Sequence, residues 1–182
     1  MKIKYETERL VIREWKKSDY KDLYEFASDE QVTKYLHYNT YENECVAKER
    51  INNLIESYKK NPLINNFAIM TKNEKKVIGD INISTYRQQA GGSVHIGYTL
   101  NRSYQGYGYA TEAVIGALKF IKKNGLAKRI EATHDTLNPK SGNVLKRVGM
   151  TFEGILRKAG ENNYHSRYDV ALYSILWEEI KL

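Results

Sequence analysis

The stretch SYQGYGYATEAVIGALKFIKKNG, from Ser103 to Gly125, places two glycines just ahead of a helical pattern. Behind the glycines, apolar residues recur every three or four positions, which is the spacing of one face of an α-helix. Gly106 and Gly108 therefore lie at the N-terminus of a predicted helix, which Gly125 can terminate. The apolar residues of the face are Ala110, Ala113, Val114, Ala117, Leu118 and Ile121.

A glycine-containing loop at a helix N-terminus is suited to binding a phosphate group. The first N–H groups of a helix have no partner within the helix and carry a partial positive charge. Glycine lets the backbone approach an anion closely because no Cβ stands in the way. The alternative is a tight turn between a strand and the helix, which needs glycine for its positive φ angles. The glycines alone do not decide between these two interpretations.

Two familiar phosphate-binding loops do not fit the residues. A dinucleotide-binding fingerprint needs a third glycine where Thr111 stands. A Walker loop needs Gly-Lys-Ser/Thr, whereas Gly108 is followed by Tyr109 and Ala110. A phosphate site at this loop would therefore belong to another class.

The rest of the chain alternates between strand and helix patterns. Alternation with period two marks strands in ERLVIREW, NFAIMT, KKVIGDINIST, SVHIGYTL, RIEATH, MTFEGILRK and SRYDVALYSILW. Helical patterns occupy YENECVAKERINNLIESYKKN, NPKSGNVLKRVG and, as one or two helices, KKSDYKDLYEFASDEQVTKYL. We expect a single mixed α/β (α+β) domain over residues 1–182, with about seven strands in a mostly antiparallel sheet and about four helices.

Composition and charge narrow the class of protein. Apolar residues make up 41% of the chain and charged residues 28%, values that are typical of globular proteins. The net charge of +7 suits an anionic partner, such as nucleic acid, an acidic protein or a phosphorylated cofactor. The basic residues are scattered rather than clustered, which disfavours nucleic acid.

Membrane, disulfide and metal chemistry are disfavoured by the sequence. No apolar run reaches the ~18 residues of a membrane span, and the N-terminus has no apolar signal core, so we expect a cytoplasmic protein that does not bind membranes. With Cys45 as its single cysteine, the chain cannot form an internal disulfide. The four histidines and this cysteine show no metal-ligand spacing, so we expect no metal site.

The segment QGYGYA, from Gln105 to Ala110, matches the pattern Gln/Arg-x-x-Gly-x-Gly/Ala. This pattern resembles the acetyl-CoA pyrophosphate loop of the GNAT superfamily of N-acetyltransferases. Four further segments are similar, in the same order, to blocks of its RimJ/RimL-type branch: ETERLVIREWKKSDYKDLYEFASDEQVTKYL, IGYTLNRSYQGYGYATEA, NPKSGNVLKRVGMTFEGILR and YDVALYSILWEE. The resemblance covers nearly the whole chain. It implies the GNAT fold, whose sheet is splayed between its fourth and fifth strands to admit the pantetheine arm of acetyl-CoA.

The resemblance also implies a reaction and a set of cofactor contacts. Acetyl-CoA donates its acetyl group to a primary amine by direct attack in a ternary complex, without a covalent enzyme intermediate. Backbone N–H groups from about Gly106 to Ala110 would hold the pyrophosphate, and the backbone around Tyr98 to Leu100 would bind the pantetheine and polarise the carbonyl. The expected cofactor-binding residues are Tyr98, Thr99, Leu100, Gln105, Gly106, Tyr107, Gly108, Tyr109, Ala110, Thr111, Asn138 and Ser141.

Three side chains are candidates for the chemistry. His95 stands where relatives often carry a glutamate, and its usual pKa suits a general base; the alternative is a histidine in a structural hydrogen-bond network. Asn138 and Ser141 match the Asn-x-x-Ser of the branch. This match implies that Asn138 bonds the pantetheine or its ordered water and that Ser141 lies near the thiol sulfur as a candidate proton donor. The structural alternative has Asn138 as a helix N-cap and Ser141 in the first turn.

Glu112, in the first turn of its helix, is expected to brace the loop.

Two other functions stay open at this point. A basic, tyrosine-rich chain could be a nucleic-acid-binding module, and a GNAT fold could serve as a catalytically inactive sensor of acyl-CoA. No motif identifies the acceptor, which among relatives is a ribosomal-protein N-terminus, a polyamine or an antibiotic. The segments expected to select it are about Val32 to Asn65 and Gly160 to Arg167. The two long C-terminal strands could support a homodimer.

Overall fold

The computed structural model describes residues 2–86, 92–162 and 167–181. Eight strands form one sheet in the order β1-β2-β3-β4-β5-β6-β8-β7. The strands are β1 (Ile3–Glu6), β2 (Leu10–Arg13), β3 (Asn66–Thr71), β4 (Val77–Tyr86), β5 (Ser93–Leu100), β6 (Arg129–Asp135), β7 (Thr151–Gly160) and β8 (Tyr168–Leu176). Every neighbouring pair is antiparallel except β5 and β6, which confirms the predicted mixed, mostly antiparallel sheet.

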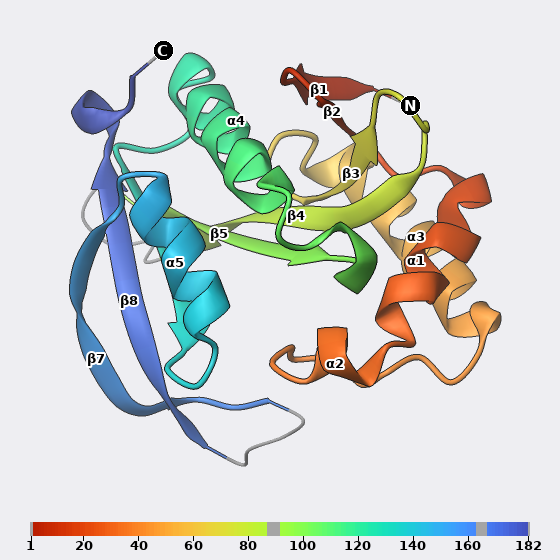
Figure 1. The fold of residues 1–182 in the computed structure, drawn as a ribbon. Helices are drawn as coiled ribbons and strands as arrows, with labels where there is room; N and C mark the ends of the chain where they lie inside the picture. Colours follow the sequence, from red (N-terminus) through yellow and green to blue (C-terminus); the bar gives the residue numbers. More distant parts are fainter. Residues whose placement is uncertain (1, 87–91, 163–166, 182) are drawn as a thin grey trace.

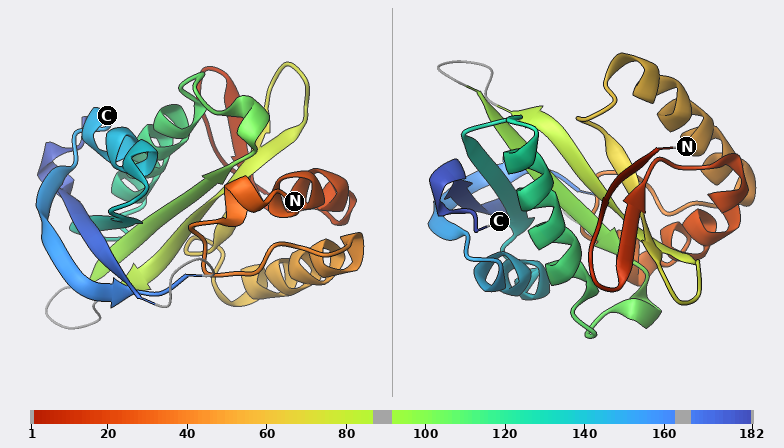
Figure 2. Two further views of the ribbon diagram at one scale, coloured as in Figure 1. Left: turned by 60° about the horizontal axis from the view of Figure 1, so that its bottom comes forward. Right: turned by 90° about the horizontal axis from the view of Figure 1, so that it is seen from above.

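The helices cover both faces of this sheet. They are α1 (Tyr20–Ala27), α2 (Glu30–Thr33), α3 (Glu44–Lys60), α4 (Tyr109–Lys123) and α5 (Pro139–Arg147). Helix α4 packs on β1, β2 and β5, whereas α1 packs on β4 and on α3. Figures 1 and 2 show α4 on one side of the central strands and α1 with α3 on the other. Within the described ranges, no helix has the length and apolar character needed to cross a membrane.

The structure adds one strand to the expected elements and resolves the segment predicted as one or two helices into α1 and the short α2. Strand β1 spans four residues at the edge of the sheet and pairs only with β2, so it is too short for an alternating pattern to mark it. Helix α2 also has four residues and begins after Asp29, whose side chain accepts a hydrogen bond from Gln31 N. Because β1 precedes the first predicted strand, the fourth and fifth predicted strands correspond to β5 and β6.

The sheet opens between β5 and β6. These two strands pair in parallel only between Ser93–His95 and Arg129–Glu131. Beyond this segment β5 continues to Leu100 alongside β4, and β6 continues to Asp135 alongside β8. Figure 1 shows the arm formed by β7 and β8 diverging from β5. The predicted splay between the fourth and fifth strands is therefore confirmed.

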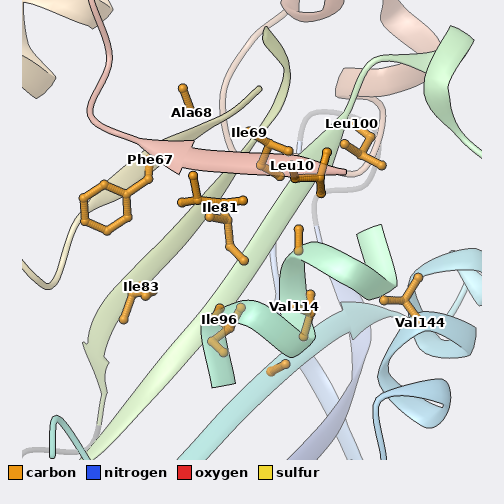
Figure 3. Packing of buried hydrophobic residues seen from close by; sticks show 14 of the residues in the cluster. Leu10, Phe67, Ala68, Ile69, Ile81, Ile83, Ile96, Leu100, Val114 and Val144 are labelled. Atoms are coloured by element: carbon orange, nitrogen blue, oxygen red, sulfur yellow. The ribbon is translucent and has the colours of Figure 1, made fainter. Parts of the chain in front are cut away.

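Buried apolar residues fill the space between the central strands and α4. Figure 3 shows Ile81 of β4 and Ile96 of β5 close to Val114 of α4. All three are buried, and burying a side chain of this size contributes roughly 1.5–3 kcal/mol. Of the helix face predicted from the sequence, only Ala110 is half-buried, and it borders a cleft. The apolar pattern thus fixes how α4 is oriented on the sheet.

The other face of the same strands is polar. Side chains alternate across a strand, so Asp80, Asn82 and Ser84 of β4 turn away from the core face that carries Ile81. On β5, Thr99 lies in register with Asp80, and His95 lies in register with Ser84. These polar residues line a cleft.

Strand β7 forms one edge of the sheet and exposes apolar side chains. Phe152, Ile155 and Leu156 of β7 are all exposed. An edge strand with this character can pair with another chain. The homodimer considered from the sequence could use this edge and stays a prediction.

Gly79 of β4 packs directly against the backbone of β5. A Cβ at this position would lie 2.1 Å from the Thr99 carbonyl oxygen and 2.8 Å from Leu100 Cδ2. We predict that Gly79→Ala lowers the free energy of unfolding by about 1–3 kcal/mol, because a backbone atom cannot move aside as a flexible side chain can. Chemical denaturation measures this change. Gly97→Ala on β5 is the matched control, since a Cβ there meets no atom within 4 Å. Equal denaturation midpoints for the two variants would contradict the prediction.

Candidate active site

A cleft of about 3160 Å³ lies where β5 and β6 separate. Its walls are the loop before α4 with the first turn of that helix, the N-terminus of α5 and the polar face of β4 and β5. Of the site residues predicted from the sequence, all except Tyr107 line this cleft. The fold therefore brings together residues from three separate segments of the chain.

Both glycines of the loop adopt the left-handed backbone conformation. The φ angle is +88° at Gly106 and +83° at Gly108. Gly108 is the N-cap residue of α4 and supplies no side chain that could cap the helix. A Cβ at Gly106 would meet no atom within 4 Å. The N-terminus of α4 is thus left without a side-chain cap and has open space in front of it, which suits an anion.

Arg9 and Glu112 hold this loop against the start of β2. Arg9 Nε lies 2.6 Å from Glu112 Oε2, and Arg9 Nη1 donates to the Tyr107 carbonyl at 3.0 Å. The Thr7 hydroxyl donates to Glu112 Oε1 at 2.6 Å. Burial acts to raise the pKa of Glu112, but the hydrogen bonds from Thr7 and Arg9 and the charge of Arg9 outweigh it and lower the pKa. Glu112 braces the loop as predicted.

The side chains of the loop differ in whether they face the cleft. The ring of Tyr109 lies beneath the Arg9 guanidinium, with 4.4 Å from Arg9 Cζ to the ring centroid. Gln105 Nε2 donates to the Leu100 carbonyl at 3.1 Å, which ties the loop to the end of β5. Tyr107 exposes 67% of its surface and lies outside the cleft lining. The structure therefore does not place the Tyr107 side chain at the predicted pyrophosphate site.

A hydrogen-bonded pair crosses the splay from β5 to α5. The Tyr98 hydroxyl donates to the Ser141 carbonyl at 2.9 Å, and it lies 3.0 Å from Ser141 Oγ. Burial raises the pKa of Tyr98 to about 12, while the hydrogen bond with Ser141 acts to lower it. Tyr98 is consequently a neutral phenol at neutral pH, and it fixes the position of Ser141 at the gap.

Asn138 begins α5, as its sequence context predicts. Its side-chain oxygen accepts a hydrogen bond from Ser141 N at 3.4 Å, and Pro139 occupies the first helical position. Beyond the other end of the helix, Gly149 has a φ of +85°. Asn138 and Ser141 both line the cleft. The N-cap role and a contact with a ligand are therefore compatible.

His95 lies at the apex of the splay, where the pairing of β5 with β6 ends. Its Nε2 lies 3.0 Å from Thr133 Oγ1, and its ring centroid lies 5.5 Å from that of Tyr86. Burial lowers the pKa of His95; the charge of Glu131 opposes this shift and that of His37 adds to it. His95 is therefore mostly neutral at pH 7 and able to accept a proton. Its contact with Thr133 also fits the structural alternative.

The loop after α2 reaches across to the other arm of the splay. The Tyr35 hydroxyl donates to the Leu137 carbonyl at 3.1 Å, just before α5. His37 Nδ1 lies 2.7 Å from the carbonyl oxygen of Glu161. The second contact joins the two segments that were expected to select the acceptor, although residues 163–166 lie outside the described part of the chain.

Two features of the site were not anticipated from the sequence. Arg9 could not be linked to the loop because its partner Glu112 lies 103 residues away. Asp80, on the polar face, is 8% exposed and lines the cleft. A signal for Asp80 existed in the stretch GDINIST, where polar residues alternate with Ile81 and Ile83 and so indicate a strand face outside the core.

Comparison with known proteins agrees with this geometry. The family model described as an acetyltransferase (GNAT) domain matches residues 9–151. The chain belongs to the GNAT acetyltransferase family. An uncharacterized N-acetyltransferase of Bacillus subtilis, YnaD, is 32% identical over 173 residues, which are 95% of this chain and 96% of that protein. The [ribosomal protein uS5]-alanine N-acetyltransferase of Escherichia coli is 26% identical over 84% of this chain and 80% of that protein.

A solved structure extends the similarity to three dimensions. The GNAT-family acetyltransferase from Bacillus anthracis is 30% identical to this chain, with a TM-score of 0.83. The match covers 98% of this acetyltransferase and 100% of the Bacillus anthracis chain. GNAT acetyltransferases use acetyl-CoA as their acetyl donor. The residues present fit that donor, because the N-terminus of α4 has no side-chain cap and borders the cleft, and β5 and β6 do not pair with each other beyond His95 and Glu131.

Substitution of Gly108 tests whether the loop binds the cofactor. We predict that Gly108→Val weakens acetyl-CoA binding by roughly 10- to 100-fold, because its Cβ would lie 3.4 Å from Arg9 Nη2, and crowding this side chain disturbs the loop whose N–H groups are expected to bind the pyrophosphate. Titration calorimetry measures the affinity. Gly125→Val is the matched control: it also places valine at a positive φ, +61°, but at the opposite end of α4. Wild-type affinity in Gly108→Val would rule out the loop as the pyrophosphate site.

Proposed function

We propose that this acetyltransferase transfers the acetyl group of acetyl-CoA to a primary amine by direct attack in a ternary complex. The acceptor would be a protein N-terminal α-amine, such as that of a ribosomal protein, or a polyamine or other small-molecule amine. One observation carries the proposal: a single cleft joins the uncapped N-terminus of α4, the gap between β5 and β6 and a polar sheet face. The name of the Escherichia coli relative supports a protein N-terminus as one of these acceptors.

The donor side of the cleft would bind the cofactor mainly through backbone groups. When bound, acetyl-CoA supplies an activated thioester. The N–H groups from about Gly106 to Ala110 would hold its pyrophosphate, and the salt bridge of Arg9 with Glu112 would keep the loop in shape. The backbone of β5 from Tyr98 to Leu100 would align the pantetheine arm and polarise the carbonyl.

On the acceptor side, an amine must lose a proton before it can attack. An α-amine has a pKa of ~8 and a lysine-type amine ~10.4, so most acceptors are protonated at neutral pH. His95 is the proposed base, acting directly or through a water molecule. Its lowered pKa keeps the imidazole unprotonated at pH 7, which is the form that a base needs.

Ser141 would serve the leaving thiolate at the other side of the gap. Its hydroxyl lies within hydrogen-bond distance of the Tyr98 hydroxyl, which would hold Ser141 in position beside the gap. Asn138 would bond the pantetheine arm while its side chain continues to cap α5. Each of these groups lines the cleft.

Thermal unfolding with acetyl-CoA, with CoA and with ATP at matched concentrations tests the proposed function. A ligand present at 100 times its Kd adds ~2.7 kcal/mol of stability. We expect a large shift of the unfolding temperature with both CoA species, a small one with ATP, and release of free thiol when an amine acceptor is added. A shift without thiol release for any amine would favour an acyl-CoA sensor. If acetyl-CoA and CoA shift the unfolding temperature no more than ATP does, the protein does not bind the cofactor. Nucleic-acid binding would then be the favoured function.

Substitution of His95 tests the assignment of the base. We predict that His95→Ala lowers kcat by roughly 100-fold near neutral pH, the usual contribution of a general base, and leaves the affinity for acetyl-CoA unchanged. Because burial lowers the pKa of His95, the wild-type rate should fall only as the pH drops below about 6.5. The pH profile of kcat shows both effects. A kcat in His95→Ala that equals the wild-type value across this range would return His95 to a structural role.

A further inference from the structure

The polar face of β4 contains a buried carboxylate, Asp80, whose role the proposed chemistry does not explain. Asp80 is paired with Ala68 of β3 on one side and with Thr99 of β5 on the other. The residue is 8% exposed and lines the cleft. Among the described residues, it is the one carboxylate on the cleft-lining face of β3, β4 and β5.

Asp80 forms no ion pair with the residues that the structure describes. In the described ranges, no basic side chain lies within 4.0 Å of its carboxylate. Burial raises the pKa of Asp80, while hydrogen bonds from Asn66 and Thr99 and the more distant charge of Arg50 oppose that rise. A buried carboxylate without an ion pair costs free energy unless a ligand provides the missing charge.

Aromatic side chains complete the surroundings of Asp80. Tyr38 lines the same cleft, and its ring centroid lies 5.5 Å from that of Tyr41. Asp80 lines this cleft as well; burial raises the pKa values of both tyrosines, and the charge of Asp80 adds to that rise. A carboxylate beside aromatic rings is the chemistry that recognises an ammonium group, through charge and through cation–π attraction.

We propose that Asp80 and Tyr38 form a cation site for the acceptor and select amines that carry a second positive charge. This inference rests on the proposed function and assigns a substrate class to it. Asp80 lies four residues along β4 from Ser84, the partner of His95 in the sheet, which is a backbone separation of ~13 Å. One cationic group of the acceptor can therefore occupy the Asp80 site while another amine reaches the apex of the splay.

Arg50 is a second charged residue that would affect the binding of a cationic acceptor. Its exposed side chain lines the cleft and acts on Asp80 from beyond ion-pair distance. A positive charge there repels a cationic acceptor. Removing the charge of Arg50 should therefore strengthen the binding of a diamine, whereas removing the charge of Asp80 should weaken it.

The test compares straight-chain diamines with monoamines of the same length, from four to eight carbons. Thiol release gives kcat and KM for each, and calorimetry gives the affinity of the diamine for the free and the CoA-saturated protein. We expect the wild-type protein to favour the best diamine over its monoamine by roughly 10- to 100-fold in kcat/KM. Asp80→Asn should remove this preference through KM, without changing the KM for acetyl-CoA, and Arg50→Gln should widen it.

Several results would overturn the cation site. A diamine preference that survives in Asp80→Asn places the recognition elsewhere, and an equal loss of kcat for both amine types indicates proton transfer instead. Absence of diamine binding by calorimetry rejects the site even when acetyl-CoA binds normally. If acetyl-CoA does not bind, the proposed function is rejected instead. Calorimetric titration of the free protein with the diamine still tests the cation site in that case. Arg50→Gln alters an exposed side chain, so its result stands even if Asp80→Asn folds poorly.

Discussion

Backbone hydrogen bonding between β5 and β6 stops after His95, and the arrangement of the cleft follows from this interruption. Beyond it, β5 stays paired with β4 and β6 stays paired with β8, so the gap has one paired strand on each side. The facing edges then carry N–H and C=O groups that need partners. An extended ligand arm can supply such partners much as an added strand does. Tyr98 and Ser141 bridge the two arms and determine how wide the gap is near α5.

The parts of the fold that sequence reasoning predicted are those that depend on local pattern. Helix α4 followed from its apolar spacing, and the start of α5 followed from Asn138 and Pro139, because caps act within one turn. The splay came from family resemblance, since no periodicity shows where two parallel strands separate. Strand β1 was too short to produce a pattern of its own, and the pattern around the short α2 did not decide between one helix and two.

The residues of the site also divide into those that local sequence patterns predicted and those that only the folded structure shows. The glycine loop and the Asn138–Ser141 pair are contiguous motifs, so the sequence could mark them, and the structure lines one cleft with them. Arg9 and Asp80 depend on the third dimension: Arg9 meets a residue 103 positions away, and Asp80 is defined by its register with Thr99. The sequence identified His95 as a residue type suited to a general base. Its burial and its contact with Thr133 arise from the folded sheet and could not be predicted.

The two faces of the central strands have different chemistry, and this has a consequence for how the enzyme can diversify. Ile81 and Ile83 are buried in the core, while the alternating positions Asp80, Asn82 and Ser84 line the cleft. Substitutions at the intervening positions leave the packing beneath the glycine loop untouched. A lineage could therefore exchange one acceptor for another by changing alternate residues of a single strand, while the glycine loop proposed to bind the donor lies on a different segment of the chain.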